Sequence, residues 1–530
     1  MIILSRLQVE VIVEMAKYKP YTTKQGIFVA VFLEDQLQTG TFEHTLNHLI
    51  DQEFDLTFFN DRYKNDETGA PAYDPKILLK IILFAYSRGI TSSRKIEQCC
   101  KENLVFMALA ASTHPHFTTI ADFVATMDKE VIDLFREVLL TCDEMGLIGK
   151  EMFAIDGCKL PSNAAKEWSG TKAEFDKKAD KLEHAIGKMV DRHHQSDNRN
   201  LEDTLQKRES KQVKTMQKHL AKIRKWLAVS EDKIGKSGKP IKSNITDNES
   251  AKMKSSRGII QGYNGVTTVD SKHQVIVHAK AVGQGNEQDL LEPMVEETKV
   301  NFKKVGKEED VFAKTKLSAD SGFHSENNMK MLSEKGIDAY VADNQFRKRD
   351  PRFTDYDRFK KRSRKERTKY YGRKGLFTTK DFTFAKDLSH CICPAGKRLY
   401  RSGYKVKMKN FVATKFKAPK SACVSCELRS QCLRKPEKTE IRQVAYFHGR
   451  SEAGKTTFSE RMKTKIDSTA GRLIYSLRVG IVEPPFAHIC QVMGLNRFSH
   501  RGKKKVNTQW NLFTIVHNMK KIHRYGLELS

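Results

Sequence analysis

The chain has 530 residues, of which 94 are Lys or Arg and 65 are Asp or Glu, so its formal net charge is +29. Hydrophobic residues make up 39% of the sequence, enough for a sizeable buried core, which excludes a broadly disordered protein. No stretch reaches the ~18 apolar residues of a membrane helix, so we expect a soluble, intracellular protein. The charge predicts a nucleic-acid partner, because neutralised phosphates release counterions. Membranes and acidic proteins are the alternative partners.

The first part of the chain, residues 1–148, is predicted to be a helical domain. One helix is expected to begin at Pro75, because proline favours the first turn, and to end at Gly89. Such helices suit DNA binding or dimerisation, and plain bundle packing is the alternative. Met15 opens a more ordinary start, so residues 1–14 are interpreted as an upstream extension.

Residues 149–346 are predicted to form the first part of an α/β core with a mixed sheet. A short apolar run that ends at Asp156 indicates a buried strand, and strands alternate with helices over residues 258–342. Residues 165–240 interrupt the core and are dense in charged residues, which predicts an inserted helical hairpin with solvated faces.

Residues 347–447 are predicted to be a second insertion, first basic and then cysteine-rich. Fourteen of the 28 residues in 347–374 are Lys or Arg, with aromatic residues between them. This stretch is expected to lie on DNA, and a disordered basic linker is the alternative. Residues 448–530 are expected to complete the catalytic core and to add C-terminal helices.

Three acidic residues are candidate ligands for two divalent ions. Asp156 and Asp320 each end an apolar run and have a glycine close behind, and Glu483 is the sole acidic residue between Asp467 and Glu528. Cutting and rejoining DNA by two ions about 4 Å apart needs only a few carboxylates brought together from distant elements. Strand-end turns and an ordinary ion pair are the alternatives.

A cysteine pattern, C-x29-C-x2-C-x5-C, suits a tetrahedral structural zinc site. The candidate ligands are Cys393, Cys423, Cys426 and Cys432. His390 and Cys391 are neighbouring donors, so the first ligand stays open. The alternative is four reduced thiols without a metal.

Residues 449–456 match the phosphate-loop pattern GxxxxGKT. A nucleotide site would need a preceding strand in a parallel sheet and a later strand that presents a magnesium-binding Asp. The one early candidate, Asp467, follows no apolar strand, so a nucleotide-binding domain is disfavoured.

Several short motifs together resemble the prokaryotic insertion-sequence DDE transposases of the IS-four-type superfamily. They are Tyr73–Lys76, Gly89–Arg94 and His116–Asp122 in the helical part, Ile155–Gly157 and Ala319–Phe323 around the two aspartates, and Tyr475–Arg478, Val482–Phe486, Arg497–Phe498, Arg501–Gly502 and His517–Asn518 near the C-terminus.

The resemblance implies an RNase H-like catalytic core, Mg²⁺ or Mn²⁺ dependence, strand cleavage at element ends and transfer of the freed 3′-hydroxyl to target DNA. It implies Asp156, Asp320 and Glu483 as metal ligands, and DNA contacts by Tyr475, Arg478, Arg497 and Arg501. Double-stranded DNA would be the partner, bound by a homodimer that pairs two element ends. The location would be the bacterial cytoplasm, on the nucleoid.

Two departures from the family pattern concern the glutamate motif. The step from Arg478 to Glu483 is five residues instead of four, and Cys490 stands where the family has lysine. Pro484 and Pro485 are predicted to bar a continuous helix, so Glu483 is expected to precede a helix that begins at Pro484.

Two alternative functions stay open. One is a non-catalytic DNA-binding protein, such as a decayed transposase or a regulator, and the other is an RNase H-like nuclease without strand transfer.

Overall fold

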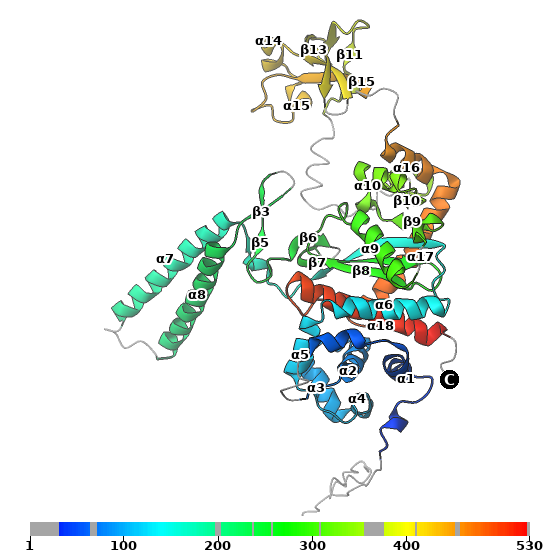
Figure 1. Ribbon diagram of the computed structural model, residues 1–530. Helices are drawn as coiled ribbons and strands as arrows, with labels where there is room; N and C mark the ends of the chain where they lie inside the picture. Colours follow the sequence, from blue (N-terminus) through cyan, green and yellow to red (C-terminus); the bar gives the residue numbers. More distant parts are fainter. Residues whose placement is uncertain are drawn as a thin grey trace, which may run out of the picture.

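The structure is a computed structural model (Figure 1). It describes residues 31–63, 71–196, 203–235, 238–255, 258–306, 309–353, 376–408, 411–450 and 456–526. The proposed extension 1–14 and most of the basic stretch 347–374 lie outside the described residues.

The N-terminal part is helical, as the sequence predicts. Pro75 occupies the first turn of its helix, and the side chain of Asp74 accepts a hydrogen bond from the Lys76 N–H. The helices are α1 (Phe42–His48), α2 (Pro75–Ser87), α3 (Ser93–Glu102), α4 (Leu104–Leu109), α5 (Phe117–Thr126) and α6 (Glu130–Glu144). They share one hydrophobic core with the sheet, and the C-terminal helix α18 (Lys503–Tyr525) lies between α1–α5 and the sheet (Figure 1).

A six-stranded mixed sheet forms the centre of the molecule. Its order is β10-β9-β1-β7-β6, and β8 also pairs with β7. Strands β6, β7 and β8 run antiparallel to their neighbours, whereas β1, β9 and β10 are mutually parallel. The strands are β1 (Met152–Pro161), β6 (Ala251–Ser255), β7 (Gly258–Asp270), β8 (Ile276–Val282), β9 (Lys316–Ala319) and β10 (Ala339–Val341).

Helices cover both faces of this sheet. On one face, Phe302 of α9 (Leu291–Lys304) stacks on Phe153 of β1 with ring centroids 5.8 Å apart. On the other face, α17 (Thr469–Ala487) packs against β1, β7, β9 and β10. Helix α10 (Glu326–Glu334) follows β9 and packs against α16 (Phe458–Asp467).

Strand β1 is longer than the sequence predicts, so the expected strand end at Asp156 is wrong. The antiparallel partner β7 pairs with β1 as far as Pro161, and this ladder keeps the chain extended. The parallel partner β9 pairs only as far as Ile155, opposite Ala319. Asp156 therefore lies in mid-strand, at the point where β1 loses one of its two neighbours.

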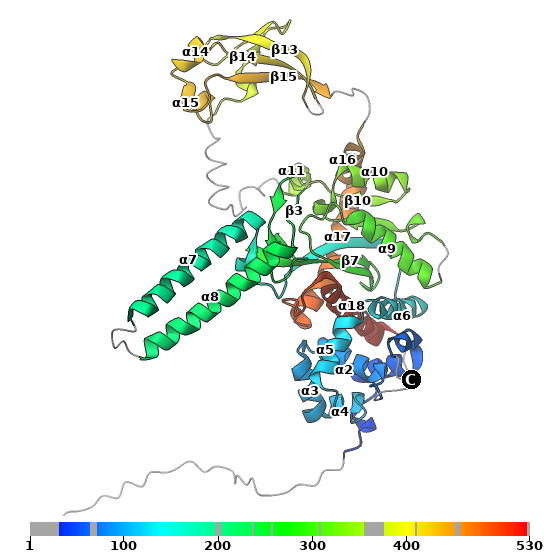
Figure 2. The same ribbon diagram turned by 60° about the vertical axis from the view of Figure 1, so that its left-hand side comes forward.

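Two long helices form the predicted hairpin between β1 and β7. They are α7 (Lys172–Ser196) and α8 (Asp203–Val229), and both views show them projecting from the main body (Figure 2). A small core at the base holds Phe175, Ile223 and Trp226. The short strands β2 (Ser169–Gly170), β3 (Lys233–Ile234), β4 (Pro240–Ile241) and β5 (Ser243–Asn244) accompany the hairpin.

The cysteine-rich segment folds as a five-stranded antiparallel sheet with its own core, which includes Phe416 and Val444. Its elements are β11 (Thr383–Phe384), β12 (His390–Ile392), β13 (Arg398–Met408), β14 (Phe411–Lys417), β15 (Gln443–Arg450), α14 (Lys420–Val424) and α15 (Arg429–Cys432). The strand before the phosphate-loop pattern is β15, an antiparallel edge strand. A nucleotide site of the phosphate-loop kind needs a parallel sheet, so this strand does not supply one.

Helix α17 continues through both prolines, so the prediction of a helix that begins at Pro484 is wrong. A proline removes the hydrogen bond to the carbonyl four residues earlier. The carbonyl freed by Pro484 belongs to Gly480, which is exposed, and the side-chain amide of Gln274 donates to it at 3.5 Å. The lost helical bond therefore has a substitute from outside the helix.

Candidate active site

Two carboxylates from neighbouring parallel strands meet at one guanidinium. Arg478 of α17 donates from Nη1 to Oδ2 of Asp156 at 2.5 Å, and its Nη2 lies 3.3 Å from Oδ1 of Asp320. Asp156 lies in β1, and Asp320 directly follows β9, where the sequence places it. The Arg478 side chain is only 10% exposed. The structure therefore brings together two predicted metal ligands and one predicted DNA contact.

The electrostatics of this pair favour a cation between the carboxylates. Burial raises the pKa of Asp156 to about 6, against the lowering influence of Arg478 and with a further raising contribution from Asp320. Burial also works against the charge of Arg478, yet the nearby Asp156 raises the pKa of Arg478 above its usual range. Asp156, buried beside a second acid, therefore needs positive charge nearby to stay ionised.

A solvent-open groove borders Asp320 and Arg478. Tyr475 lies in its wall, with its ring against Phe346 at 5.2 Å and the Arg478 guanidinium 5.7 Å from the ring centroid. The wall also carries the cationic side chains Arg347, Lys348, Arg352 and Arg472. A polyanion in this groove would meet a largely positive wall that leads to the two aspartates.

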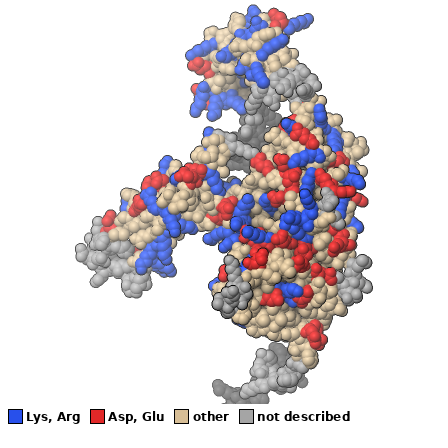
Figure 3. Space-filling view, viewed as in Figure 1, with Lys and Arg blue, Asp and Glu red and all other residues tan. Residues whose placement is uncertain are grey.

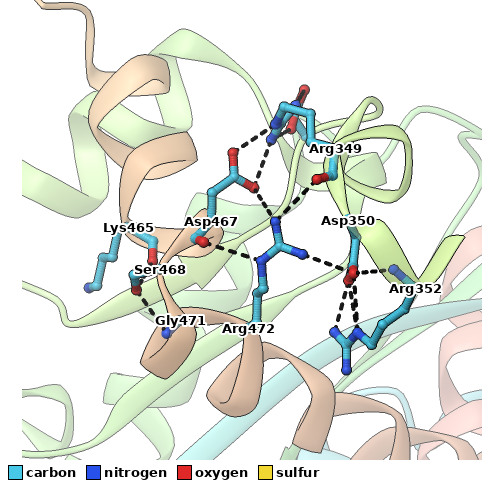
Figure 4. Close-up of polar contacts among 9 residues, drawn as sticks. Arg349, Asp350, Arg352, Lys465, Asp467, Ser468, Gly471 and Arg472 are labelled. Carbon is cyan, nitrogen blue, oxygen red and sulfur yellow. Dashed lines mark hydrogen bonds and ion pairs between the residues drawn. The ribbon is translucent and has the colours of Figure 1, made fainter. Parts of the chain in front are cut away.

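An ion-pair network holds α17 in place beside the groove (Figure 4). The guanidinium of Arg472 lies 2.9 Å from Oδ1 of Asp350, whose side chain is 1% exposed. The Nε of Arg472 donates to the carbonyl of Asp467. Arg349 donates to the carboxylate of Asp467 at 2.7 Å and to that of Asp343 at 2.6 Å. These bonds tie the segment after β10 to the junction of α16 and α17, and so fix the helix that presents Arg478.

The glycines that follow the two aspartates, Gly157 and Gly322, both face neighbouring side chains that would crowd a Cβ. A Cβ at Gly157 would lie 2.7 Å from Oδ1 of Asn264, and one at Gly322 would lie 2.1 Å from Oε2 of Glu287. Asn264 donates to Glu287 at 3.2 Å, and Lys159 lies 2.9 Å from the same carboxylate. The two glycines therefore make room for one buried polar cluster beside the aspartates. The glycines were visible in the sequence, but the residues that approach them were not.

Glu483 is not brought to the aspartate pair. It lies on α17 five residues beyond Arg478, a step that turns an α-helix by about 140°. Val482, four residues beyond Arg478, takes the inward position and is buried, whereas Glu483 is exposed. No hydrogen bond or ion pair joins the side chain of Glu483 to another residue within the described ranges.

The other predicted DNA contacts lie elsewhere. Arg497 donates to the carbonyl of Ser162 at 2.9 Å, and Arg501 donates to the carbonyl of Asn163 at 2.7 Å, both in the loop after β1. Both arginines are exposed. Cys490, at the position of the family's lysine, has its sulfur 3.8 Å from that of Cys158.

The four candidate zinc ligands line one cavity of the β11–β15 sheet, between the end of β12 and helices α14 and α15. Burial raises the pKa of Cys432, and the three other cysteines are near enough to raise it further. In the part of the chain that the structure describes, however, no group of three or more His, Cys, Asp or Glu side chains is arranged to hold a metal ion. This applies to both candidate metal sites.

The mixed sheet, the strand-borne aspartate pair and the basic groove define an α/β protein with an acidic site suited to phosphate chemistry on a polyanion. Two protein-family models match the chain: "Transposase DDE domain" over residues 392–523 and "Transposase domain (DUF772)" over residues 31–126. These matches support a DDE transposase, hence an enzyme of the polynucleotidyl transferase type that acts on DNA with a divalent metal. A search of curated proteins gave no match. No helix of the described ranges is both long and apolar enough to span a bilayer.

Proposed function

We propose that the protein is an insertion-sequence transposase that cleaves DNA at element ends and transfers the freed 3′-hydroxyl to target DNA. The meeting of Asp156 and Asp320 at Arg478 carries this proposal. Strands β1, β7 and β8 pair antiparallel, and β9 and β10 continue the sheet parallel to β1, an order that supports an RNase H-like assignment. Asp156 lies within β1, and Asp320 directly follows β9.

The residues present fit a hard divalent cation, because carboxylate oxygens are its preferred ligands and two of them already converge. When bound, a pair of Mg²⁺ or Mn²⁺ ions would activate the attacking hydroxyl and stabilise the leaving oxygen. Asp156 and Asp320 would hold the ions, and Arg478 would turn from the carboxylates to a phosphate of the bound DNA. The Nε of Arg478 is buried and has no acceptor among the described residues, so it can donate to that phosphate.

The third ligand is proposed to be Glu483, which shares α17 with Arg478. Its exposed side chain must swing toward the pair when DNA displaces Arg478. Glu287 is the control residue for the mutagenesis, because its carboxylate lies near Gly322 but is not one of the proposed metal ligands. Glu483→Gln should abolish metal-dependent cleavage, whereas Glu287→Gln should retain part of it. The reverse ranking would remove Glu483 from the site.

Tyr475 and Arg478 are proposed to contact the element end, and Arg497 and Arg501 to contact DNA from the loop after β1. Ser162 lies six positions beyond Asp156, roughly 20 Å along a strand, so the two sets would touch different parts of one duplex. We propose a homodimer that pairs two ends, acting in the cytoplasm on nucleoid DNA.

The test is cleavage of duplex DNA taken from the borders of the encoding element, with Mg²⁺ or Mn²⁺. Asp156→Asn and Asp320→Asn should lose cleavage but keep DNA binding. Asp310→Asn is the control, because Asp310 pairs with Lys299 on the surface and is no part of the site. Cleavage that survives in both site variants would exclude the proposal. A precleaved end that is bound but never joined to target DNA would indicate a nuclease, and binding without any cleavage would indicate a regulator.

For the cysteine-rich sheet we propose a structural zinc ion held by Cys393, Cys423, Cys426 and Cys432. Their common cavity supports this, and binding would draw the thiolates together. Elemental analysis of the purified chain should find about one zinc per chain, reduced in Cys423→Ser and unchanged in Cys99→Ser, a cysteine of α3. Protein purified without chelator that contains no zinc would exclude the site.

A further inference from the structure

We propose that the β11–β15 sheet binds single-stranded DNA by stacking nucleobases on an aromatic platform, defined as Tyr404, Tyr446 and His448. The inference goes beyond the proposed catalysis, since its argument uses no residue of the candidate active site. Strand β13 supplies Tyr404, and β15 supplies the two other rings.

The three rings form one continuous exposed patch. His448 lies between the tyrosines, with its ring centroid 6.3 Å from that of Tyr404 and 5.4 Å from that of Tyr446, each in an edge-to-face arrangement. Tyr404 is 55% exposed and Tyr446 is 40% exposed, so both rings keep surface that is open to a ligand. Phe384 supports Tyr446 from below, at 5.2 Å. Exposed, mutually braced rings are what unpaired bases stack on.

A buried hydroxyl fixes this patch. Oγ1 of Thr414, a residue with no exposed surface, lies 2.7 Å from Nε2 of His448 and accepts a hydrogen bond from the Lys405 N–H at 3.4 Å. Lys405 has a φ of 46°, an uncommon conformation for a residue with a side chain. The imidazole and the backbone beside Tyr404 are therefore held in position before any ligand arrives.

The charge around the platform selects a polyanion. The guanidinium of Arg401 lies 5.1 Å from the Tyr404 ring centroid, and the ammonium of Lys405 lies 5.4 Å from it. Residues 376–448 contain 16 Lys and Arg against 5 Asp and Glu, a net charge of +11. Lys and Arg predominate on the face of this sheet that Figure 3 shows. Rings that stack bases together with cations that meet phosphates fit a single strand, because the bases of a duplex are already stacked on one another.

The opposite face of the same sheet provides a matched control. Tyr400 pairs with Lys417, whereas the adjacent Phe416 pairs with Val444 on the face that carries Tyr446. Side chains alternate along a strand, so Tyr400 points away from the platform. It is 57% exposed and also has an arginine, Arg398, near its ring. It therefore matches Tyr404 in exposure and charge but has no partner ring in the patch.

The experiment measures binding of a fluorescent oligothymidine of about 20 nucleotides to the full chain in 0.3 M salt, which weakens purely ionic contacts. We expect Tyr404→Ala and Tyr446→Ala to bind about five- to twentyfold more weakly, and Tyr404→Trp to bind as the parent chain does. Tyr400→Ala should stay within twofold. Asp310→Asn, a surface change on the main body and outside the candidate active site, should also leave this binding unchanged.

Several results would overturn the inference. Equal losses in Tyr400→Ala and Tyr404→Ala would show that the charge of the sheet, and not the platform, binds the strand. An equal loss of duplex binding in Tyr404→Ala would remove the preference for unpaired bases. Tighter binding of an oligouridine RNA would contradict the choice of DNA. Dissociation of a dimer in Tyr404→Ala, seen by sedimentation, would assign the patch to contact between two copies of the chain.

Discussion

Removing Arg478 should expose the metal-binding capacity of the aspartate pair. In Arg478→Ala, Asp156 and Asp320 lose the guanidinium that contacts both. Breaking a buried ion pair costs ~3–5 kcal/mol. The Asp320 side chain is 38% exposed, so solvent screens part of its charge, and we expect a loss of about 2–3 kcal/mol in the free energy of unfolding.

A divalent cation should then stabilise the variant more than the parent chain. At a Mn²⁺ concentration ten times the dissociation constant, binding to the folded state adds about 1.4 kcal/mol. In the parent chain the ion must first displace Arg478, so the gain without DNA should stay below about 0.5 kcal/mol. Urea denaturation with and without Mn²⁺, in the absence of DNA, measures both values.

Arg472→Ala is the matched control, since Arg472 lies on the same helix and pairs with the buried Asp350. It should lose stability without gaining any response to Mn²⁺. Equal stabilisation of the parent chain and Arg478→Ala by Mn²⁺ would refute the reasoning. A gain in Arg472→Ala would show that Mn²⁺ binds elsewhere.

Three further results are expected, each measurable by chemical denaturation. Burial lowers the pKa of His517 to about 3 and that of His488 to about 4, so as pH falls from 6.5 to about 4 each histidine lowers the free energy of unfolding by about 1.4 kcal/mol per pH unit. Asp156, whose pKa burial raises to about 6, offsets one of these two contributions below pH 6. Replacing both histidines by Gln should make the stability fall less steeply over this range, and an unchanged slope would contradict the assignment. Gly265→Ala places a Cβ 2.8 Å from a buried indole of α18 and should cost about 1–3 kcal/mol, and a cost near zero would show that α18 shifts freely. Gly322→Ala meets only the end of a flexible carboxylate and should cost less than Gly265→Ala; a greater cost would show that this carboxylate cannot turn away.

The histidine pair also has a defined tautomer. Nε2 of His517 lies 3.0 Å from the carbonyl of Gln274, so it carries the proton and donates. Its Nδ1 is then an acceptor, and Nδ1 of His488, 2.9 Å away, must donate to it. Protonation of His517 would place two donors face to face. The loss of this hydrogen bond adds to burial in disfavouring protonation of His517.

Local sequence signals predicted the elements they control directly. Pro75 begins α2, and the charged segment between β1 and β7 forms the two hairpin helices. Asp320 follows β9 as predicted, because that strand has no partner beyond Ala319. The predicted end of β1 was wrong because the length of a strand depends on its partner. Here the partner is β7, and local sequence does not reveal that pairing.

The candidate site was predictable in part. The two aspartates and Arg478 were named from motifs, and the structure brings these three side chains together. The position of Glu483 depends on helix phase, and the continuation of α17 through two prolines sets that phase. The Asn264–Glu287 bond joins residues 23 positions apart, and only the folded sheet brings it to the glycines behind the aspartates.

The ion pairs of Figure 4 join the two ends of a long excursion of the chain. Arg349 and Asp350 stand where the chain leaves the main body, and Asp467 and Arg472 stand just after it returns. More than one hundred residues separate these two points along the chain, yet ion pairs between side chains connect the points directly. A short linker in place of residues 354–455 should leave α17 seated. The same closure would let evolution exchange the intervening sheet while the acidic centre stays intact.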